Sequence, residues 1–290
     1  MFERVTIVGT GLIGGSLARD LRRLALCDDI VGAGRSEATL ARARALGLID
    51  RYETDIAAAV AGADLVVVAV PLGAMTQVLA RMRDPLRADA VVTDVGSAKR
   101  SVLAAAREVF GAPPPFFVPG HPIAGTEKSG VEAALDGLVE RHRGILTPVA
   151  ETDPEATARV RAMWQAVGAE VLEMDPDHHD EVLAATSHLP HMLAYTLVDV
   201  LGRMEERVEI FRYAAGGFRD FTRIASSDPQ MWHDICFANR DALMHALEHF
   251  HADLDRAMDA IRRGDGEALK ELFTRAKRLR DRFARESEVR

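Results

Sequence analysis

Short apolar runs alternate with helical patterns through the first half of the chain. Several runs are continuous and rich in β-branched residues, which is typical of strands that helices cover on both faces. Segments such as 15–24 and 37–46 have helical spacing. Strand and helix in alternation predict a parallel, doubly wound sheet. The predicted strands are 5–8, 30–33, 65–70, 90–95, 116–118, 144–147 and 170–174.

Strand patterns stop after about residue 175, and the second half has only helical ones. Asp228 followed by Pro229 fits a helix start, with Asp as the cap and Pro in the first turn. We therefore predict an α/β domain over 1–174 and an all-α domain over 175–290. The apolar spacing over 232–261 extends further than a small domain needs, so we expect a homodimer through the helical domain. The predicted helices are 177–203, about 205–214, 228–263 and 265–287.

Composition narrows the class of protein. The 290 residues are 48% hydrophobic, which is enough for a hydrophobic core that needs no disulfide or metal cross-links. A net charge of −8 disfavours a nucleic-acid partner, and no apolar run reaches the ~18 residues of a membrane span. The N-terminus lacks the basic start of a signal peptide. The sequence has two cysteines, Cys27 and Cys236, which excludes a disulfide framework and favours a reducing compartment. Together these features lead us to expect a cytoplasmic enzyme with a small-molecule substrate.

A glycine-rich loop follows the first predicted strand and opens a helix. It has the form G-x-G-x-x-G, in which the glycines allow a tight turn, a close approach of backbone to pyrophosphate, and helix–strand packing. The first turn of the helix then presents free N–H groups to the anion. We predict a Rossmann-like dinucleotide-binding domain. Its expected cofactor contacts are Gly9, Thr10, Gly11, Leu12, Ile13 and Gly14.

The end of the second strand bears on which nicotinamide cofactor is used. NAD sites usually place an acid there for the ribose 2′-hydroxyl, but no Asp or Glu stands at this tip. Arg35 and Ser36 would instead hold a 2′-phosphate, which favours NADP and leaves NAD open. The plainer alternative is a solvated arginine and a serine that caps the next helix. We also include Val70 and Pro71, at the end of strand 65–70, among the cofactor contacts.

Three further segments carry candidate chemistry. Ser97 and His121 each follow a predicted strand, at the edge where open α/β sheets bind ligands. A histidine in such a loop is a candidate general base, and Ser97 is either a helix cap, a catalytic group or both. Arg223 lies past Gly216-Gly217 and offers a two-N–H clamp for a carboxylate, the alternative being a surface ion pair.

Histidines also gather where the helical half begins. They stand in Asp177-His178-His179-Asp180 and in Ser187-His188-Leu189-Pro190-His191. His188 and His191 share one face if the helix continues, although Pro190 predicts a kink. The spacing matches no compact metal-ligand pattern, so we predict no metal and favour a polar substrate cleft. The roles of His178, His179 and His188 stay open.

Taken together, these motifs resemble the prephenate/arogenate dehydrogenase family of tyrosine biosynthesis. The resemblance runs in order over nearly the whole chain. The glycine loop is shared by many dehydrogenases, whereas the stretches 121–127 and 216–223 are specific to this family. The matching stretches are Gly9 to Ser16, Asp94-Val95-Gly96-Ser97, His121-Pro122-Ile123-Ala124-Gly125-Thr126-Glu127, Ser187-His188-Leu189-Pro190-His191, Gly216-Gly217-Phe218-Arg219-Asp220-Phe221-Thr222-Arg223-Ile224-Ala225 and Asp228-Pro229-Gln230-Met231-Trp232.

The resemblance implies oxidative decarboxylation of prephenate, of arogenate or of both, with hydride transfer to NAD(P). It implies that His121 takes the proton of the ring hydroxyl and that Ser97 orients His121. Arg223 would bind a substrate carboxylate, and Glu127 would pair with Arg223 as an ionic gate. The other residues implied to contact substrate are Thr126, Ser187, His191 and Gly216. Asp220 would support Arg223. The position of Asp180 gives a slight indication that it binds the amino group of arogenate.

Two other readings stay open. One is a related dehydrogenase acting on a 3-hydroxy acid or an imine, but such enzymes rely on a lysine in the helical half. Here Lys270 and Lys277 are the only lysines after residue 175, and both lie in a charged helix. The other is a non-catalytic NADP-binding sensor, which would need none of the site residues. The sequence does not separate prephenate from arogenate, since their side chains differ by one small group.

Overall fold

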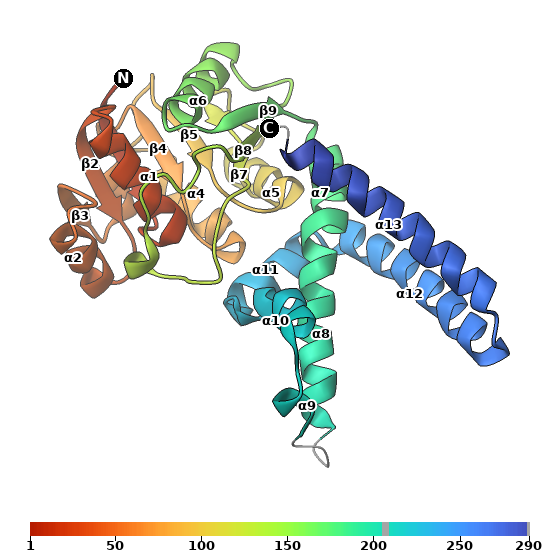
Figure 1. Ribbon diagram of the computed structural model, residues 1–290. Helices are drawn as coiled ribbons and strands as arrows, with labels where there is room; N and C mark the ends of the chain where they lie inside the picture. Colours follow the sequence, from red (N-terminus) through yellow and green to blue (C-terminus); the bar gives the residue numbers. More distant parts are fainter. Residues whose placement is uncertain (205–208, 289–290) are drawn as a thin grey trace. The chain divides into compact units, whose positions relative to one another are not determined.

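The computed structural model describes residues 1–204 and 209–288 and divides them into two compact units, Met1–Leu243 and Met244–Arg290. The first unit begins with strands and helices in alternation (Figure 1). In chain order its α/β part holds β1 (Phe2–Val8), α1 (Leu12–Arg23), β2 (Cys27–Ala33), α2 (Glu37–Ala45), β3 (Arg51–Glu53), α3 (Ile56–Val60), β4 (Leu65–Val68), α4 (Met75–Met82), β5 (Val91–Asp94), α5 (Lys99–Phe110), β6 (Phe117–Val118), β7 (Gly120–Pro122), β8 (Arg143–Leu146), α6 (Pro154–Ala166) and β9 (Glu170–Glu173).

Six strands form a parallel sheet in the order β3-β2-β1-β4-β5-β6. Helices α1 and α6 pack on one face, where Leu21 and Trp164 are fully buried, and α3, α4 and α5 cover the other. Strand order reverses between β1 and β4, which is where such sheets bind dinucleotides. The predicted Rossmann-like fold is therefore confirmed.

Two features of the strands differ from the sequence prediction. β3 is short and half-buried, so its pattern is not apolar. Strands β8 and β9, predicted as part of the parallel sheet, form a separate three-stranded sheet with β7. β7 runs antiparallel to β8 and pairs His121 with Ile145. Its three residues include a proline, so its sequence does not indicate a strand.

The helical region of the first unit deviates from regular helices at two places. The predicted helix 177–203 is α7 (Pro176–Leu183), a π-helical turn (Ala184–His188) and α8 (Leu189–Arg203). The π-turn ends just before Pro190, where a proline nitrogen leaves the helical ladder short of a donor. The predicted helix 228–263 is wrong as one element, because Asn239 separates α11 (Pro229–Ala238) from α12 (Arg240–Arg263).

The segment between α8 and α11 is only partly described. Residues 205–208 of the predicted helix 205–214 lie outside the described residues. The part that follows holds α9 (Glu209–Arg212), α10 (Gly216–Thr222) and a 3-10 turn (Arg223–Ser226). Arg223 thus lies at the point where α10 ends.

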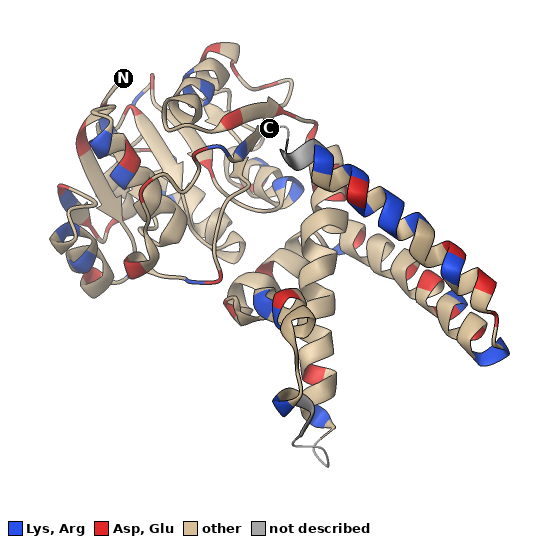
Figure 2. Cartoon of the chain, viewed as in Figure 1, with Lys and Arg blue, Asp and Glu red and all other residues tan. Residues whose placement is uncertain are grey.

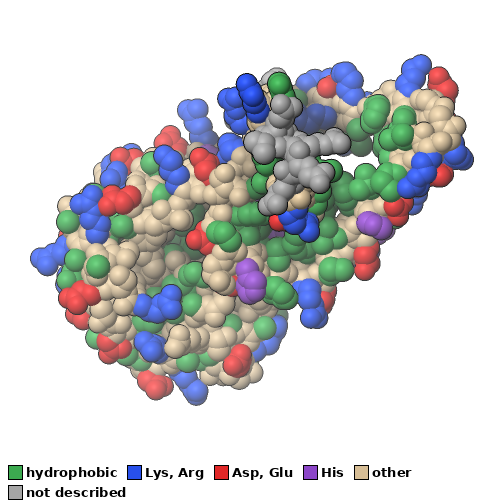
Figure 3. All heavy atoms as spheres, turned by 90° about the horizontal axis from the view of Figure 1, so that it is seen from below, with side chains coloured by type: hydrophobic (Ala, Val, Ile, Leu, Met, Phe, Trp, Pro, Cys, Tyr) green, Lys and Arg blue, Asp and Glu red, His purple; other side chains and the backbone are tan. Residues whose placement is uncertain are grey.

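The second unit consists of most of α12 and of α13 (Gly266–Glu288). Charged residues are dense along α13 and sparse along α8 (Figure 2). Hydrophobic side chains lie open on the face of the molecule that Figure 3 shows. In this unit Phe273 and Ile261 are each 64% exposed. Within the described ranges, no helix combines the length and apolar character needed to cross a membrane.

Candidate active site

The loop between β1 and α1 is shaped by its glycines. Gly9 has φ +101°, and a Cβ there would lie 2.2 Å from the Ala69 carbonyl oxygen. A Cβ on Gly14 would lie 2.0 Å from the Gly9 oxygen, whereas one on Gly11 would meet no atom within 4 Å. The space beside Gly11 is therefore open. Helix α1 begins there without a side-chain cap or an acid in its first turn. The free N–H groups and the open space fit the pyrophosphate of a dinucleotide.

The other predicted cofactor contacts lie around the same sheet edge. Val70 is half-buried, and its Cγ1 would be 3.3 Å from a Cβ on Gly9, while Pro71 is exposed at the start of the next turn. Arg35 is exposed, and its guanidinium has no hydrogen-bond or ion-pair partner in the described part of the chain. Ser36 caps α2 by accepting from the N–H of Thr39 at 3.2 Å, as the plainer reading expected. Its hydroxyl hydrogen remains available to a phosphate oxygen.

A fully buried ion pair underlies the catalytic edge. The ammonium of Lys99 lies 2.5 Å from Asp94 Oδ2 and also donates to the Gly120 carbonyl at 2.6 Å. Asp94 accepts the N–H groups of Gly96 and Gly120 at 2.7 and 3.1 Å. These bonds tie the turn after β5, which carries Ser97, to the strand that carries His121. Burial lowers the pKa of Lys99, and the charge of Asp94 opposes this shift.

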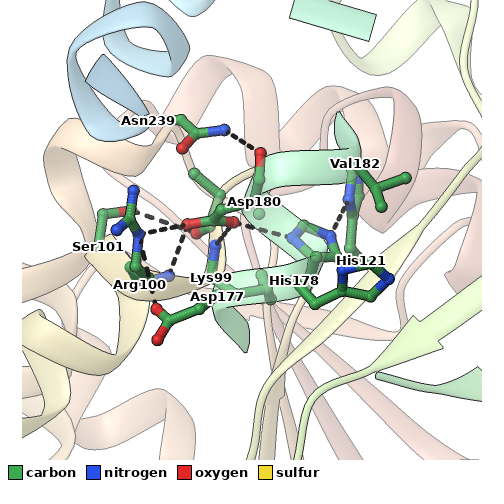
Figure 4. Close-up of polar contacts among 12 residues, drawn as sticks. Lys99, Arg100, Ser101, His121, Asp177, His178, Asp180, Val182 and Asn239 are labelled. Atoms are coloured by element: carbon green, nitrogen blue, oxygen red, sulfur yellow. Dashed lines mark hydrogen bonds and ion pairs between the residues drawn. The ribbon is translucent and has the colours of Figure 1, made fainter. Parts of the chain in front are cut away.

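His121 is held by another histidine rather than by Ser97. Its Nδ1 lies 2.9 Å from Nε2 of His179, and Nδ1 of His179 lies 2.8 Å from Oδ1 of Asp180. Figure 4 shows Asp180 between the start of α5 and the side of the site where His121 lies. His179 and Asp180 are fully buried on α7. Ser97 is half-buried, and within the described residues its side chain makes no hydrogen bond to His121, so its orienting role stays a prediction.

Asp180 caps a helix that lies far from it in sequence. Its two oxygens accept the N–H groups of Lys99 and Arg100 at 2.7 and 3.0 Å, which are the first N–H groups of α5. Burial acts to raise the pKa of Asp180, but the His179 ring and these N–H groups outweigh it and hold the pKa below its ordinary value. The hint that Asp180 binds an amino group is wrong for this structure, because its carboxylate is buried and already occupied.

The imidazoles of the site are kept neutral. Burial lowers the pKa of His121 well below its ordinary value, and the neighbouring His179 and Lys99 add to the shift. Burial also lowers the pKa of His179, opposed by Asp180, and it lowers the pKa of His188 to about 4. A neutral imidazole has a free lone pair, so His121 is in the state that a general base requires.

The predicted pair of Glu127 and Arg223 is present. Arg223 Nη1 donates to Glu127 Oε2 at 3.1 Å, and both side chains are open to solvent. Its own backbone hydrogen bond and then the charge of Arg223 lower the pKa of Glu127. The predicted support of Arg223 by Asp220 is not formed, since Asp220 is exposed and makes no polar contact within the described chain.

His191 packs against the ring of Trp232. It stacks on Trp232 with ring centroids 3.6 Å apart, and its Nδ1 donates to the Ser187 carbonyl at 2.9 Å. Burial lowers the pKa of His191, and Arg223 contributes to the same direction. The Nε1–H of Trp232 is buried and has no hydrogen-bond partner among the described residues.

His188 and Asn239 are joined by a hydrogen bond. The buried amide of Asn239 donates to the Asp180 carbonyl at 2.7 Å and to His188 Nδ1 at 3.1 Å. Asn239 therefore links the end of α11 to α7 and to the π-turn, and this explains the break in the predicted helix 228–263. His178, in contrast, is an exposed residue near Glu181.

The other predicted substrate residues do not bond to the side chains of the site described above. Thr126 is exposed and accepts the Lys128 N–H at 3.2 Å, and Ser187 is half-buried on the π-turn. Gly216 begins α10 with open space around it. Across the described ranges, no group of three or more His, Cys, Asp or Glu residues is arranged to hold a metal ion.

Sequence reasoning missed five residues that build the site. Asp94 stands in the motif Asp94-Val95-Gly96-Ser97 and Lys99 follows two residues later, but nothing local shows that they form a buried pair. The sequence indicates no role for His179 or for Trp232. Asn239 gave no signal except an amide within an apolar helical pattern. The five are Asp94, Lys99, His179, Trp232 and Asn239.

Known proteins match both halves of the chain. Residues 17–173 match the prephenate dehydrogenase nucleotide-binding domain, and residues 175–275 match the prephenate dehydrogenase dimerization domain. The chain is 42% identical to the cyclohexadienyl dehydrogenase of Zymomonas mobilis, over 97% of this chain and 96% of that protein.

Two solved structures are similar over almost their whole length. One is prephenate dehydrogenase from Aquifex aeolicus in complex with hydroxyphenyl propionate and NAD+, with a TM-score of 0.89, 39% identity, and coverage of 97% of this chain and 98% of that one. The other is arogenate dehydrogenase from Synechocystis, with a TM-score of 0.79, 28% identity, and coverage of 97% and 99%.

Proposed function

Because the chain belongs to the prephenate dehydrogenase family, we propose that it oxidatively decarboxylates prephenate, arogenate or both, with a nicotinamide cofactor. The observation that carries the proposal is the neutral imidazole of His121 at the sheet edge, with its Nδ1 occupied by His179. Its Nε2 is then the atom that accepts the proton of the ring hydroxyl. When bound, the cofactor takes the hydride from the carbon that carries this hydroxyl.

The substrate's carboxylates require cationic and hydrogen-bonding partners. We assign Arg223 to one carboxylate, because its planar fork suits that group and because, within the described residues, its guanidinium bonds to Glu127 alone. An incoming carboxylate would displace Glu127, which makes this pair an ionic gate. His191, Ser187 and the N–H of Trp232 would line the side of the ring carboxylate. Loss of CO2 then follows because it makes the ring aromatic.

One assay tests the proposal. Reduced cofactor is measured with prephenate and with arogenate, each with NAD and with NADP. His121→Asn should lower kcat by about 10²–10⁴ with little change in KM, which is the span for a lost general base. His178→Asn, at an exposed neighbouring histidine, is the matched control and should behave as the wild type. A His121→Asn enzyme with near-normal kcat would remove His121 from this role.

The cofactor preference is a finer proposal. The unpartnered Arg35 and the absence of an acid at the tip of β2 support NADP, whereas the similar structure from Aquifex aeolicus contains NAD+. Arg35→Ala should raise KM for NADP about tenfold or more, since it removes a phosphate contact, and should leave KM for NAD unchanged. A wild-type kcat/KM at least about tenfold higher with NAD would overturn the preference.

We also propose a homodimer through the helical domain, with a division between 1–174 and 175–290. Support comes from α8, where only Ala194 is buried although the helix is mainly apolar, and from the match of 175–275 to a dimerization domain. Exposed apolar side chains on α12 and α13 add to this, because a monomer rarely leaves such surface open. Sedimentation that shows a dilution-stable monomer would contradict it. A cytoplasmic location remains part of the proposal, supported by the two free cysteines.

A further inference from the structure

A chain of hydrogen bonds runs inward from the proposed base. It passes from His121 through His179 to Asp180, with donor–acceptor distances of 2.9 and 2.8 Å. His179 and Asp180 are fully buried, so water does not compete for these bonds. In the proposed function His179 only occupies Nδ1 of His121, a task that any hydrogen-bond acceptor could perform and that does not require an imidazole.

The carboxylate determines which nitrogen carries each hydrogen. An ionised Asp180 only accepts, so Nδ1 of His179 donates to it. A neutral imidazole has a single N–H, so Nε2 of His179 must accept and Nδ1 of His121 must donate. This order leaves Nε2 of His121 without a hydrogen. When Nε2 of His121 takes up a proton, this arrangement therefore lets Nδ1 of His121 pass its own proton to His179.

Building on the proposed function, we propose that His179, held against Asp180, stores the substrate's hydroxyl proton during turnover and then returns it. When the hydride leaves, the hydroxyl proton binds His121 Nε2, and His121 releases its Nδ1 proton to His179 Nε2. The ring carbon becomes a ketone. Breakage of the bond to the carboxylate releases CO2, and its electron pair makes the ring aromatic and leaves a negative charge on the ring oxygen. The stored proton then returns through His121 to that oxygen.

This balance explains why a store inside the protein is useful. The proton that leaves the hydroxyl is the one that the product oxygen needs, so none has to be exchanged with solvent. Positive charge on His179 lies 2.8 Å from the Asp180 carboxylate, where it forms a buried ion pair. The N–H groups of Lys99 and Arg100 hold Asp180 ionised, so the proton stops at His179.

Other charged groups lie around the hydrogen bonds from His121 to Asp180, but they do not compete for the transferred proton. Lys99 is already paired with Asp94, and His188 accepts from Asn239. The titratable and charged groups that face His179 and His121 are Asp180 on α7, Asp94 on β5, Lys99 and Arg100 on α5, and His188 on the π-turn.

His179→Gln separates storage from positioning. The amide oxygen of glutamine reaches the place of Nε2 and still accepts from His121 Nδ1, but an amide does not take up a proton. We expect kcat to fall at least about tenfold while KM for the substrate stays within about twofold. His178→Gln, one residue away and exposed, is the control and should match the wild type. A wild-type kcat in His179→Gln would overturn the proton store, whereas the wild-type rate in the same assay tests the proposed function.

Asp180→Asn and a resting-state spectrum complete the test. Without the carboxylate the imidazole pair holds a proton less tightly, so the acidic limb of kcat/KM should move to lower pH. A limb that stays in place would contradict the proposal.

Proton NMR of the wild type should show a low-field imidazole N–H signal that is absent in Asp180→Asn and His179→Gln and kept in His178→Gln. Equal low-field signals in all four proteins would overturn the hydrogen-bonded chain, whatever the activity.

Discussion

Acid should destabilise this protein in part through the buried ring of His188. His188 is 1% exposed, and its pKa in the fold is about 4 instead of the ordinary 6.5. Its Nδ1 accepts from Asn239, so the ring is neutral in the folded protein. Between these two pH values the unfolded chain binds a proton that the folded chain does not. As far as His188 contributes, the free energy of unfolding is therefore at its maximum above pH 6.5 and decreases as the pH drops toward 4.

The size of the effect follows from the shift. Each pKa unit corresponds to about 1.4 kcal/mol, so His188 removes about 2 kcal/mol by pH 5 and about 3 kcal/mol below pH 4. Urea unfolding of wild type and His188→Asn at a series of pH values isolates this part. In the variant the Asn oxygen replaces Nδ1 as the acceptor, and it does not titrate.

The comparison with a second histidine makes the test specific. His188→Asn should lose about 2 kcal/mol less than the wild type between pH 7 and pH 5, once their difference at pH 7 is subtracted. His178→Asn, at an exposed position, should follow the wild-type curve. Parallel curves for wild type and His188→Asn would refute the reasoning, because they would mean that the buried ring contributes no pH-dependent stability.

Three further outcomes are expected. Lys99→Met should lower the free energy of unfolding by about 3–5 kcal/mol in urea, because it leaves the buried charge of Asp94 unpaired, and Asp94→Asn in the same chain should recover part of the loss; a loss of under about 1 kcal/mol would contradict the buried pair. Arg223→Ala should mainly raise KM, by roughly 2–4 kcal/mol of lost binding if the pair with the carboxylate is desolvated, and an unchanged KM would return Arg223 to the role of a surface partner of Glu127. Tyrosine, which shares the ring and side chain with the products, should compete with substrate at millimolar concentration, and an unchanged KM would exclude this.

The sequence by itself determined the parts of this protein that depend on short-range pattern. Continuous β-branched runs with helices between them predict a parallel sheet, and G-x-G-x-x-G after the first strand predicts the dinucleotide loop, which the structure forms with Gly9 at a positive φ. His121 stands out because it follows a strand at the ligand-binding edge of the sheet, and Arg223 stands out because it follows Gly216-Gly217 in the helical half. The physical reason is that periodicity, turns and caps are decided by neighbours a few residues away.

Only the tertiary structure decided what supports these residues. The partner of His121 is 58 residues away, and Asp180 caps a helix that starts 81 residues before it. Asn239 interrupts an apolar helical pattern because its amide bonds to α7 and the π-turn. A buried polar group must find a partner wherever the packed elements bring one, and the identity of that partner depends on how the layers meet rather than on local sequence.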